Sequence, residues 1–299
     1  MTDRRSRMTR TRTGKSLALT ERDIAIFRAL SHYRYLRSSY LHAFAGGASQ
    51  TRFKERLGDL FHEGFLDRPS KQWAFAEARY RPAFHELGER GRRALAEFGG
   101  EGAGARTFLA SSAHRQFSHA TMICECLASI ELATRSLPQV RFIPWSEILA
   151  RAPEQTRASA LPQKVAVSGG AVIPDGLFGL EYQAEGGKAY RFFTLEADRG
   201  TMPVSRSNGA QTSCLGKLAL YGEIIARGLH KLHWGIPNLL VLTVTTDARR
   251  LENIRRTLGG AHPAFLFKAV EPRTLTESYP ALLTESWLRA GLPALPIAS

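Results

Sequence analysis

The sequence predicts an α+β chain with two domains, a mainly helical N-terminal domain followed by an α/β domain. Three observations support this prediction. Residues 19–98 show helical periodicity with two short extended runs, residues 99–105 are rich in Gly and Ala (GGEGAGA), and residues 113–272 alternate between helix and strand patterns. At 299 residues, the chain is long enough for two domains of ordinary size.

The most distinctive element is a basic amphipathic helix within residues 49–66, SQTRFKERLGDLFHEGFL. Its apolar stripe has the spacing i, i+4, i+7 and i+8: Phe53, Leu57, Leu60 and Phe61. Its opposite face is polar and basic: Gln50, Arg52, Lys54 and Arg56. Ser49 is expected to cap the start of this helix and Gly64 to end it. One face can therefore pack on a core while the other faces a groove, as in the second helix of a helix-turn-helix.

Two further helices are expected before this one, at residues 20–30 and 35–44, with a Gly-rich turn at 45–47. Thr20 and Asp23 form a capping-box-like pair at the start of the first helix. After the basic helix, two extended runs, FLDRP and YRPAFHEL, flank a polar connection and indicate a β-wing. The wing carries basic residues near its tip: Arg68, Lys71, Arg79 and Arg81. A closing helix is expected at residues 89–98.

This order of elements resembles a winged helix-turn-helix domain over residues 19–98. If the domain binds DNA, four side chains of the basic helix are expected to read base edges: Gln50, Thr51, Arg52 and Arg56. Four cations are expected to hold phosphates of double-stranded DNA: Lys54, Arg68, Lys71 and Arg79.

The charge of the chain supports a polyanionic partner. The formal net charge is +14 and the pI is about 10.2, and nucleic acid is the commonest partner of such a protein. Residues 1–18 are basic and lack the apolar segment of a secretory signal, so we expect a disordered arm there. No run of 18 apolar residues predicts a membrane span. Three cysteines without zinc spacing indicate a reducing, cytoplasmic protein.

The second half of the chain has a mixed pattern of elements. Strands are expected at residues 140–145, 171–182, 190–195, 238–245 and 264–269. Helices are expected at residues 114–135, 213–227 and 247–258. The segment AEGGK at 184–188 indicates the turn of a hairpin, and residues 150–168 are expected to be a loop.

Three carboxylates lie near the ends of the expected hairpin strands. Asp175 follows Ile173 and Pro174 in the first strand, and Glu196 and Asp198 end the second. Because neighbouring ends of paired strands lie close together, these carboxylates can converge and hold Mg²⁺, which prefers oxygen ligands. Such an ion could activate water and stabilise charge on a phosphodiester. The alternative is structural, with the acids capping strands or pairing with arginines.

This segment resembles the core of PD-(D/E)xK nucleases, the restriction-endonuclease-like fold. Pro174 and Asp175 match the "PD", and Glu196-Ala197-Asp198 stands where the family has "(D/E)xK". The usual lysine position is Asp198, so the resemblance implies that Lys217 on the following helix replaces it. The implied catalytic set is Asp175, Glu196, Asp198 and Lys217, with Mg²⁺ at the three acids. A further acid would be Glu125 or Glu131.

Most of the chain is similar to the replication-relaxation family of plasmid and mobile-element proteins. The residues that carry this similarity are Pro174, Asp175, Glu196, Asp198, Arg199, Gly200, Thr201, Lys217 and Tyr221. The similarity implies DNA binding in replication or mobilisation, with a homodimer or replication and relaxosome proteins as partners. Two alternatives stay open, a Mg²⁺-dependent DNA endonuclease or nickase and a winged-helix transcriptional regulator.

The expected division of the chain follows from these assignments: a basic arm at 1–18, the winged helix-turn-helix at 19–98, a linker at 99–112, the nuclease-like domain at 113–272 and a C-terminal extension at 273–299.

Overall fold

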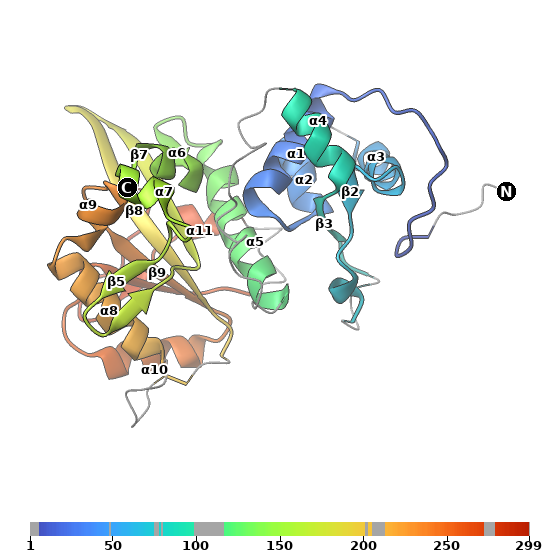
Figure 1. Ribbon diagram of the computed structural model, residues 1–299. Helices are drawn as coiled ribbons and strands as arrows, with labels where there is room; N and C mark the ends of the chain where they lie inside the picture. The colour runs from blue at the N-terminus through green and yellow to red at the C-terminus, as the bar shows by residue number, and fades with distance from the viewer. Residues whose placement is uncertain are drawn as a thin grey trace. The chain divides into compact units, whose positions relative to one another are not determined.

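The chain mixes helices and sheets in two compact units, Met1–Ala128 and Ser129–Ser299 (Figure 1). The computed structural model describes residues 6–47, 49–74, 78, 80–98, 117–200, 203–204, 213–271 and 279–298. The mixed α/β character agrees with the sequence prediction. We expected the division in a linker at residues 99–112, which lies outside the described residues. The contacts place the division within helix α5, Phe117–Thr134.

The first unit contains helices around a small sheet (Figure 1). Its helices are α1 Glu21–Tyr33, α2 Ser38–Ala45, α3 Gln50–His62, α4 Glu89–Glu97 and the first part of α5. Its strands are β1 Leu36–Arg37, β2 Leu66–Asp67 and β3 Phe84–Leu87, which form an antiparallel sheet in the order β1-β3-β2. A 3₁₀ helix, η1 Ser70–Ala74, follows β2.

The predicted helix starts are confirmed in this unit. The Thr20 side chain accepts the Asp23 N–H, and the Asp23 side chain accepts the Thr20 N–H, which completes a capping box. The Ser49 hydroxyl accepts the Arg52 N–H at the start of α3. Gly64, just beyond α3, has a φ of +83°, a conformation that glycine adopts without strain.

The structure differs from the prediction at two places in this unit. The helix expected from residue 35 begins only at Ser38, because Leu36 and Arg37 pair with His85 and Phe84 of β3. The polar connection between the two extended runs contains η1, which was not predicted and in which the Gln72 amide exchanges two hydrogen bonds with the Phe84 backbone. Both differences depend on contacts between distant parts of the chain, which local periodicity does not contain.

The N-terminal segment also differs from the expected disordered arm. Residues 6–18 form no helix or strand but hydrogen bond to α3 and β2. The Arg10 guanidinium donates to the Phe61 and Leu66 carbonyl oxygens, each at 2.9 Å. This segment therefore has defined partners in the first unit.

The second unit is built on a six-stranded sheet in the order β11-β10-β9-β8-β7-β4. These strands are β4 Val140–Ile143, β7 Gly176–Ala184, β8 Gly187–Asp198, β9 Leu240–Thr245, β10 Phe265–Ala269 and β11 Leu288–Arg289. Strands β8, β9 and β10 are parallel, whereas β7 pairs with β8 as an antiparallel hairpin. The hairpin and the buried central strand β9 were predicted and are confirmed.

The remaining elements of the second unit surround this sheet. A two-stranded sheet consists of β5 Val165–Val167 and β6 Gly170–Val172. The helices are α6 Trp145–Arg151, α7 Glu154–Ala158, α8 Cys214–Ala226, α9 Leu229–Trp234, α10 Ala248–Leu258 and α11 Ala281–Thr284. Ser213 and Asp247 cap α8 and α10, whose positions agree with the prediction. No helix in the described parts of the chain is long and apolar enough to cross a membrane.

Several boundaries in this unit correct the sequence prediction. Residues 171–172 belong to β6 and pair with β5, so the hairpin begins at Gly176 rather than at 171. The strand from Val140 ends before Pro144, which has no N–H for a sheet and starts α6 instead. The expected loop at 150–168 contains α7 and β5. The segment after residue 278 contributes the edge strand β11, which pairs with β10.

Candidate functional site

The N-terminal half of α3 exposes a polar surface of five side chains: Gln50, Thr51, Arg52, Lys54 and Glu55. The opposite side of the helix is buried, as the apolar stripe predicted: Phe53, Leu57, Leu60 and Phe61. Within the described part of the chain, no carboxylate forms an ion pair with Arg52 or Lys54. The two charges therefore remain available to an anion in solution.

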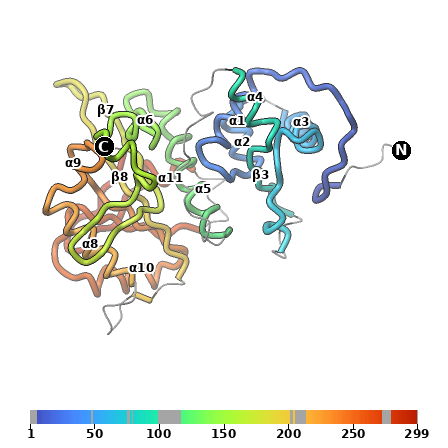
Figure 2. The backbone as a smooth tube through the Cα atoms, viewed as in Figure 1, coloured from blue at the N-terminus to red at the C-terminus, as the bar shows by residue number. Residues whose placement is uncertain are grey.

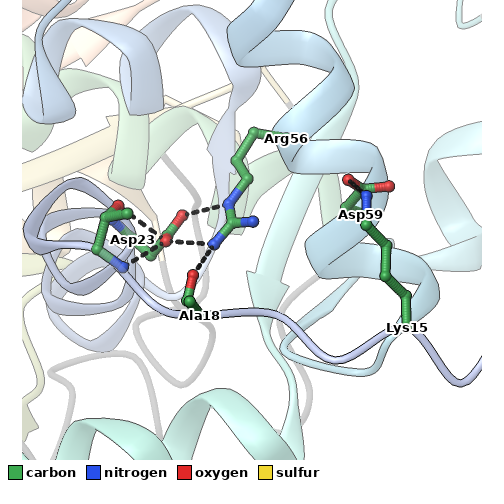
Figure 3. Close-up of polar contacts among 6 residues, drawn as sticks. Lys15, Ala18, Asp23, Arg56 and Asp59 are labelled. Atoms are coloured by element: carbon green, nitrogen blue, oxygen red, sulfur yellow. Dashed lines mark hydrogen bonds and ion pairs between the residues drawn. The ribbon is translucent and has the colours of Figure 1, made fainter.

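Arg56 lies on the same helix but has protein partners (Figure 3). Its Nε donates to Asp23 Oδ1 at 3.0 Å, and one terminal nitrogen donates to Asp23 Oδ2 at 2.6 Å and to the Ala18 carbonyl at 2.7 Å. Asp23 is only 1% exposed. Burial alone raises the pKa of Asp23, but hydrogen bonds from Arg56 and Thr20 outweigh it, so the pKa lies below its usual value. Arg56 thus fastens α3 to the start of α1, and its guanidinium is already engaged.

Of the expected phosphate-binding residues of the wing, one has protein partners and one is exposed. Arg68 donates to His85 Nε2 at 3.2 Å and to the Arg7 carbonyl at 2.9 Å, and its guanidinium lies 4.3 Å from the centre of the Phe61 ring. Burial lowers the pKa of Arg68 to about 10 and that of His85 to about 3, so the imidazole is a neutral acceptor. Lys71 is exposed. Arg79 lies outside the described residues.

In the second unit, a buried carboxylate on β8 is bound by two side chains of α8. Glu196 Oε2 accepts from the Lys217 ammonium, and Glu196 Oε1 accepts from the Tyr221 hydroxyl. Lys217 and Tyr221 are four residues apart, so they lie on one face of α8. The Ser213 hydroxyl fixes the start of that helix by accepting the Gly216 N–H at 3.1 Å. The position of the helix therefore brings both donors to the same carboxylate.

Burial controls the protonation of this cluster. It raises the pKa of Glu196 to about 7, an effect that Lys217 opposes and the nearby Asp175 carboxylate strengthens. Burial and the negative charge of Glu196 raise the pKa of Tyr221 far above its usual value. The Tyr221 side chain is fully buried and stays protonated, so it acts as a hydrogen-bond donor and not as an attacking nucleophile.

Asp175 lies beside Glu196, immediately before β7. Its Oδ2 accepts the Ala197 N–H at 2.9 Å, and its own N–H donates to the Leu195 carbonyl at 3.1 Å. These bonds connect the residue to the strand that carries Glu196. The structure therefore brings three residues of the predicted catalytic set together, Asp175, Glu196 and Lys217.

Asp198, the fourth residue of that set, is held by a different helix. Both of its oxygens accept from the guanidinium of Arg250 on α10, one of them at 3.0 Å. Arg250 was not singled out from the sequence. The sequence offered a partial signal, because the parallel strands β8 and β9 end at the same edge of the sheet and α10, which carries Arg250, begins shortly after β9, but the pattern did not give the direction of the Arg250 side chain.

The carboxylates do not form the metal site that the sequence suggested. Among the residues that the structure describes, no group of three or more His, Cys, Asp or Glu side chains has the arrangement to hold a metal ion. Lys217 and Tyr221 engage both oxygens of Glu196, and Arg250 engages both oxygens of Asp198. As arranged, this donor set does not fit Mg²⁺, because the ion would have to replace the Lys217 and Arg250 cations and the Tyr221 hydroxyl.

The two acids considered as further ligands also have partners. Glu125 accepts from the Arg37 Nε at 2.7 Å in the first unit. Glu131 pairs with Arg135 one turn further along α5, at 3.5 Å.

Comparison with known proteins identifies one family. The family model described as replication-relaxation matches residues 27–239, a span that contains α3 and the Glu196 cluster. No curated protein and no solved structure matches the chain significantly. Because the matched span covers more than half of the 299 residues, this chain belongs to the replication-relaxation family.

Proposed function

We propose that this protein binds double-stranded DNA through α3 and acts in the replication or relaxation of a plasmid or other mobile element. Membership of the family suggests a role of this kind for the chain. The observation that carries DNA binding is the exposed face of α3, a capped helix with Arg52 and Lys54 available to anions. A basic helix of this kind suits the major groove, and its charge suits the phosphates.

The arrangement of the first unit supports a winged helix-turn-helix over residues 19–98. Helices α2 and α3 are joined by a short Gly-containing turn, and the paired strands β2 and β3 follow α3 as a wing would, with β1 from before α2 completing the sheet. In this proposal Gln50, Thr51 and Arg52 face base edges, and Lys54 and Lys71 hold phosphates. Arg56 and Arg68 do not contact DNA in this proposal, and their bonds to other protein groups hold α3 and the wing in position. The protein would act in the cytoplasm, in keeping with its three free, buried cysteines.

Charge reversal on α3 tests this function. The variant Arg52→Glu/Lys54→Glu should bind a mixed-sequence duplex on the order of 100-fold more weakly at about 0.1 M salt, because two attractive charges become repulsive. Fluorescence anisotropy measures this loss. A matched control, Lys231→Glu/Arg256→Glu, makes the same charge change on exposed residues of the second unit and should bind like the wild type. Equal affinity of the α3 variant and the wild type would remove α3 from the interface.

A second candidate function is a metal-dependent DNA endonuclease or nickase. The observation in its favour is the proximity of Asp175, Glu196 and Lys217, two acids and a lysine next to one sheet edge. Lys217 holds the Glu196 carboxylate in place, and its displacement would be the first requirement of this function.

Nicking of supercoiled plasmid in the presence of Mg²⁺ or Mn²⁺ tests the second candidate. Activity that is lost in Asp175→Ala and kept in Glu154→Gln, an exposed acid on α7, would establish it. Absence of nicking by the wild type with both ions would leave DNA binding as the function and the second unit as its nuclease-like but inactive partner.

A further inference from the structure

The N-terminal arm, which we define as residues 6–18, docks on the C-terminal half of α3 through backbone and side-chain hydrogen bonds. The Thr11 N–H donates to His62 Nδ1 at 3.1 Å. Thr13 binds one Glu63 oxygen twice, through its N–H at 3.0 Å and its hydroxyl at 2.6 Å. With the Arg10 bonds to Phe61 and Leu66, these contacts give the arm a fixed course past the end of the helix (dark blue in Figure 2).

Two ion pairs accompany these hydrogen bonds. Lys15 Nζ lies 2.8 Å from Asp59 Oδ2 on α3 (Figure 3), and the Arg10 guanidinium pairs with Asp67 on β2. The Lys15 side chain is 56% exposed and that of Asp67 is 39% exposed. Their partners Asp59 and Arg10 are 15% and 30% exposed, so solvent screens one side of each pair and limits its contribution to folding. We therefore relate these two ion pairs to the charge of the protein surface beside α3.

The position of Asp59 makes its charge important for the proposed DNA-binding face. Asp59 follows Arg52 by seven residues, which is two helical turns, so the two side chains lie on the same side of α3. The helical rise places them roughly 10 Å apart along the axis, about one Debye length at roughly 0.1 M salt. Without Lys15, the Asp59 carboxylate, which also interacts electrostatically with Arg56, would be less fully neutralised and would repel a phosphate approaching Arg52. Asp67 would add a second negative charge where the chain leaves α3 for the wing.

We propose that the docked arm is an electrostatic shield for the DNA-binding face of α3. Lys15 cancels the charge of Asp59, and Arg10 cancels the charge of Asp67, so that these two acids do not repel duplex DNA, whereas the exposed Glu55 keeps its charge. The arm acts through these two acids and not by grasping phosphates as a flexible tail. The inference rests on the proposed DNA binding and names the part of the chain that tunes its strength.

A double-mutant cycle separates shielding from direct contact. The variant Arg10→Gln/Lys15→Gln should bind a mixed-sequence duplex roughly tenfold more weakly than the wild type at about 0.1 M salt. In the background Asp59→Asn/Asp67→Asn, the same two arm substitutions should change affinity by less than about twofold, because the two carboxylates that the arm neutralises are gone. Fluorescence anisotropy gives all four affinities.

Three results would contradict the shield in distinguishable ways. An equal loss of affinity in both backgrounds would mean that the arm cations touch DNA directly, and no loss in either would mean that the arm is irrelevant. In both of those cases the proposed function survives if Arg52→Glu/Lys54→Glu still abolishes binding. A wild type that does not bind duplex at all would overturn the proposed function and the shield together. Unchanged thermal unfolding of the arm variant confirms that it folds.

Discussion

Arg52 and Arg56 are about one turn apart on α3, but their surroundings give them different roles. Arg52 is exposed and has no carboxylate partner among the described residues, whereas Arg56 makes two hydrogen bonds to the buried Asp23. A helical wheel places both on the polar face and cannot separate them. The distinction depends on α1, which brings Asp23 to the middle of α3.

Removal of the Arg56 charge should destabilise the first unit. Arg56→Gln leaves Asp23 buried with only its Thr20 hydrogen bonds, and such a loss typically costs several kcal/mol. Because the Arg56 side chain is 28% exposed, we expect a smaller decrease of about 2 kcal/mol in the free energy of unfolding, measured by urea denaturation. The control Arg52→Gln should leave stability unchanged. A stable Arg56→Gln variant that has lost DNA affinity would return Arg56 to the role of a base reader.

The residues of the second candidate site could be predicted from the sequence only in part. The position of Asp175 and Glu196 on neighbouring strands followed from the hairpin pattern. The pairing of Asp198 with Arg250 did not, because Arg250 is 52 residues away in the chain and the pattern says nothing about side-chain direction. Lys217 and Tyr221 both donate to Glu196, whose carboxylate is buried. That burial arises only when the sheet and α8 are assembled, so the sequence pattern did not predict these two bonds.

At the scale of elements, helices with strong caps were the easiest to predict. Helices α1, α3, α8 and α10 each combine an N-cap side chain with a buried face, and all four begin within one residue of the expected position. Short elements such as β1, η1 and β6 were missed. β1 and η1 are held by β3, which is distant in sequence, and runs of two to five residues carry too little periodicity to reveal any of the three elements.

Helix α5 is attached to the first unit by a buried ion pair. The Arg37 Nε donates to Glu125 at 2.7 Å, and the same guanidinium lies 4.1 Å from the centre of the Phe84 ring. Burial raises the pKa of Glu125 to about 7, although Arg37 opposes the shift. The protonated form is therefore favoured in the folded chain more than in the unfolded chain.

This raised pKa predicts a pH-dependent contribution to stability. The stabilisation is fully present below pH 4.5, where Glu125 is protonated in both states, and is lost as the pH rises through about 7. Glu125→Gln does not titrate, so its unfolding free energy should gain roughly 1–3 kcal/mol relative to the wild type between pH 4.5 and 7.5. Urea denaturation at several pH values measures this difference. A constant difference between the two proteins would show that Glu125 is ionised in the fold.

At the scale of the whole molecule, the net charge of +14 is the property that sequence alone established best. Charge of this size favours nucleic acid but does not say where it binds. The structure narrows the choice, because many cations, including Arg10, Arg56 and Arg250, are already paired with carboxylates. Arg52 and Lys54 have no such partner among the described residues, so they place available positive charge on the exposed N-terminal half of α3. Family membership supplies the biological setting that charge and geometry do not contain.

The salt dependence of duplex binding tests this central claim most directly. The affinity of the full chain for a mixed-sequence duplex should fall steeply between about 50 and 200 mM salt, because bound phosphates release counterions. In Arg52→Glu/Lys54→Glu, the residual binding should be weak and depend less on salt. In Lys231→Glu/Arg256→Glu, both the affinity and its slope should match the wild type. The same steep slope in the α3 variant, or its loss in the control, would contradict the assignment of DNA binding to α3.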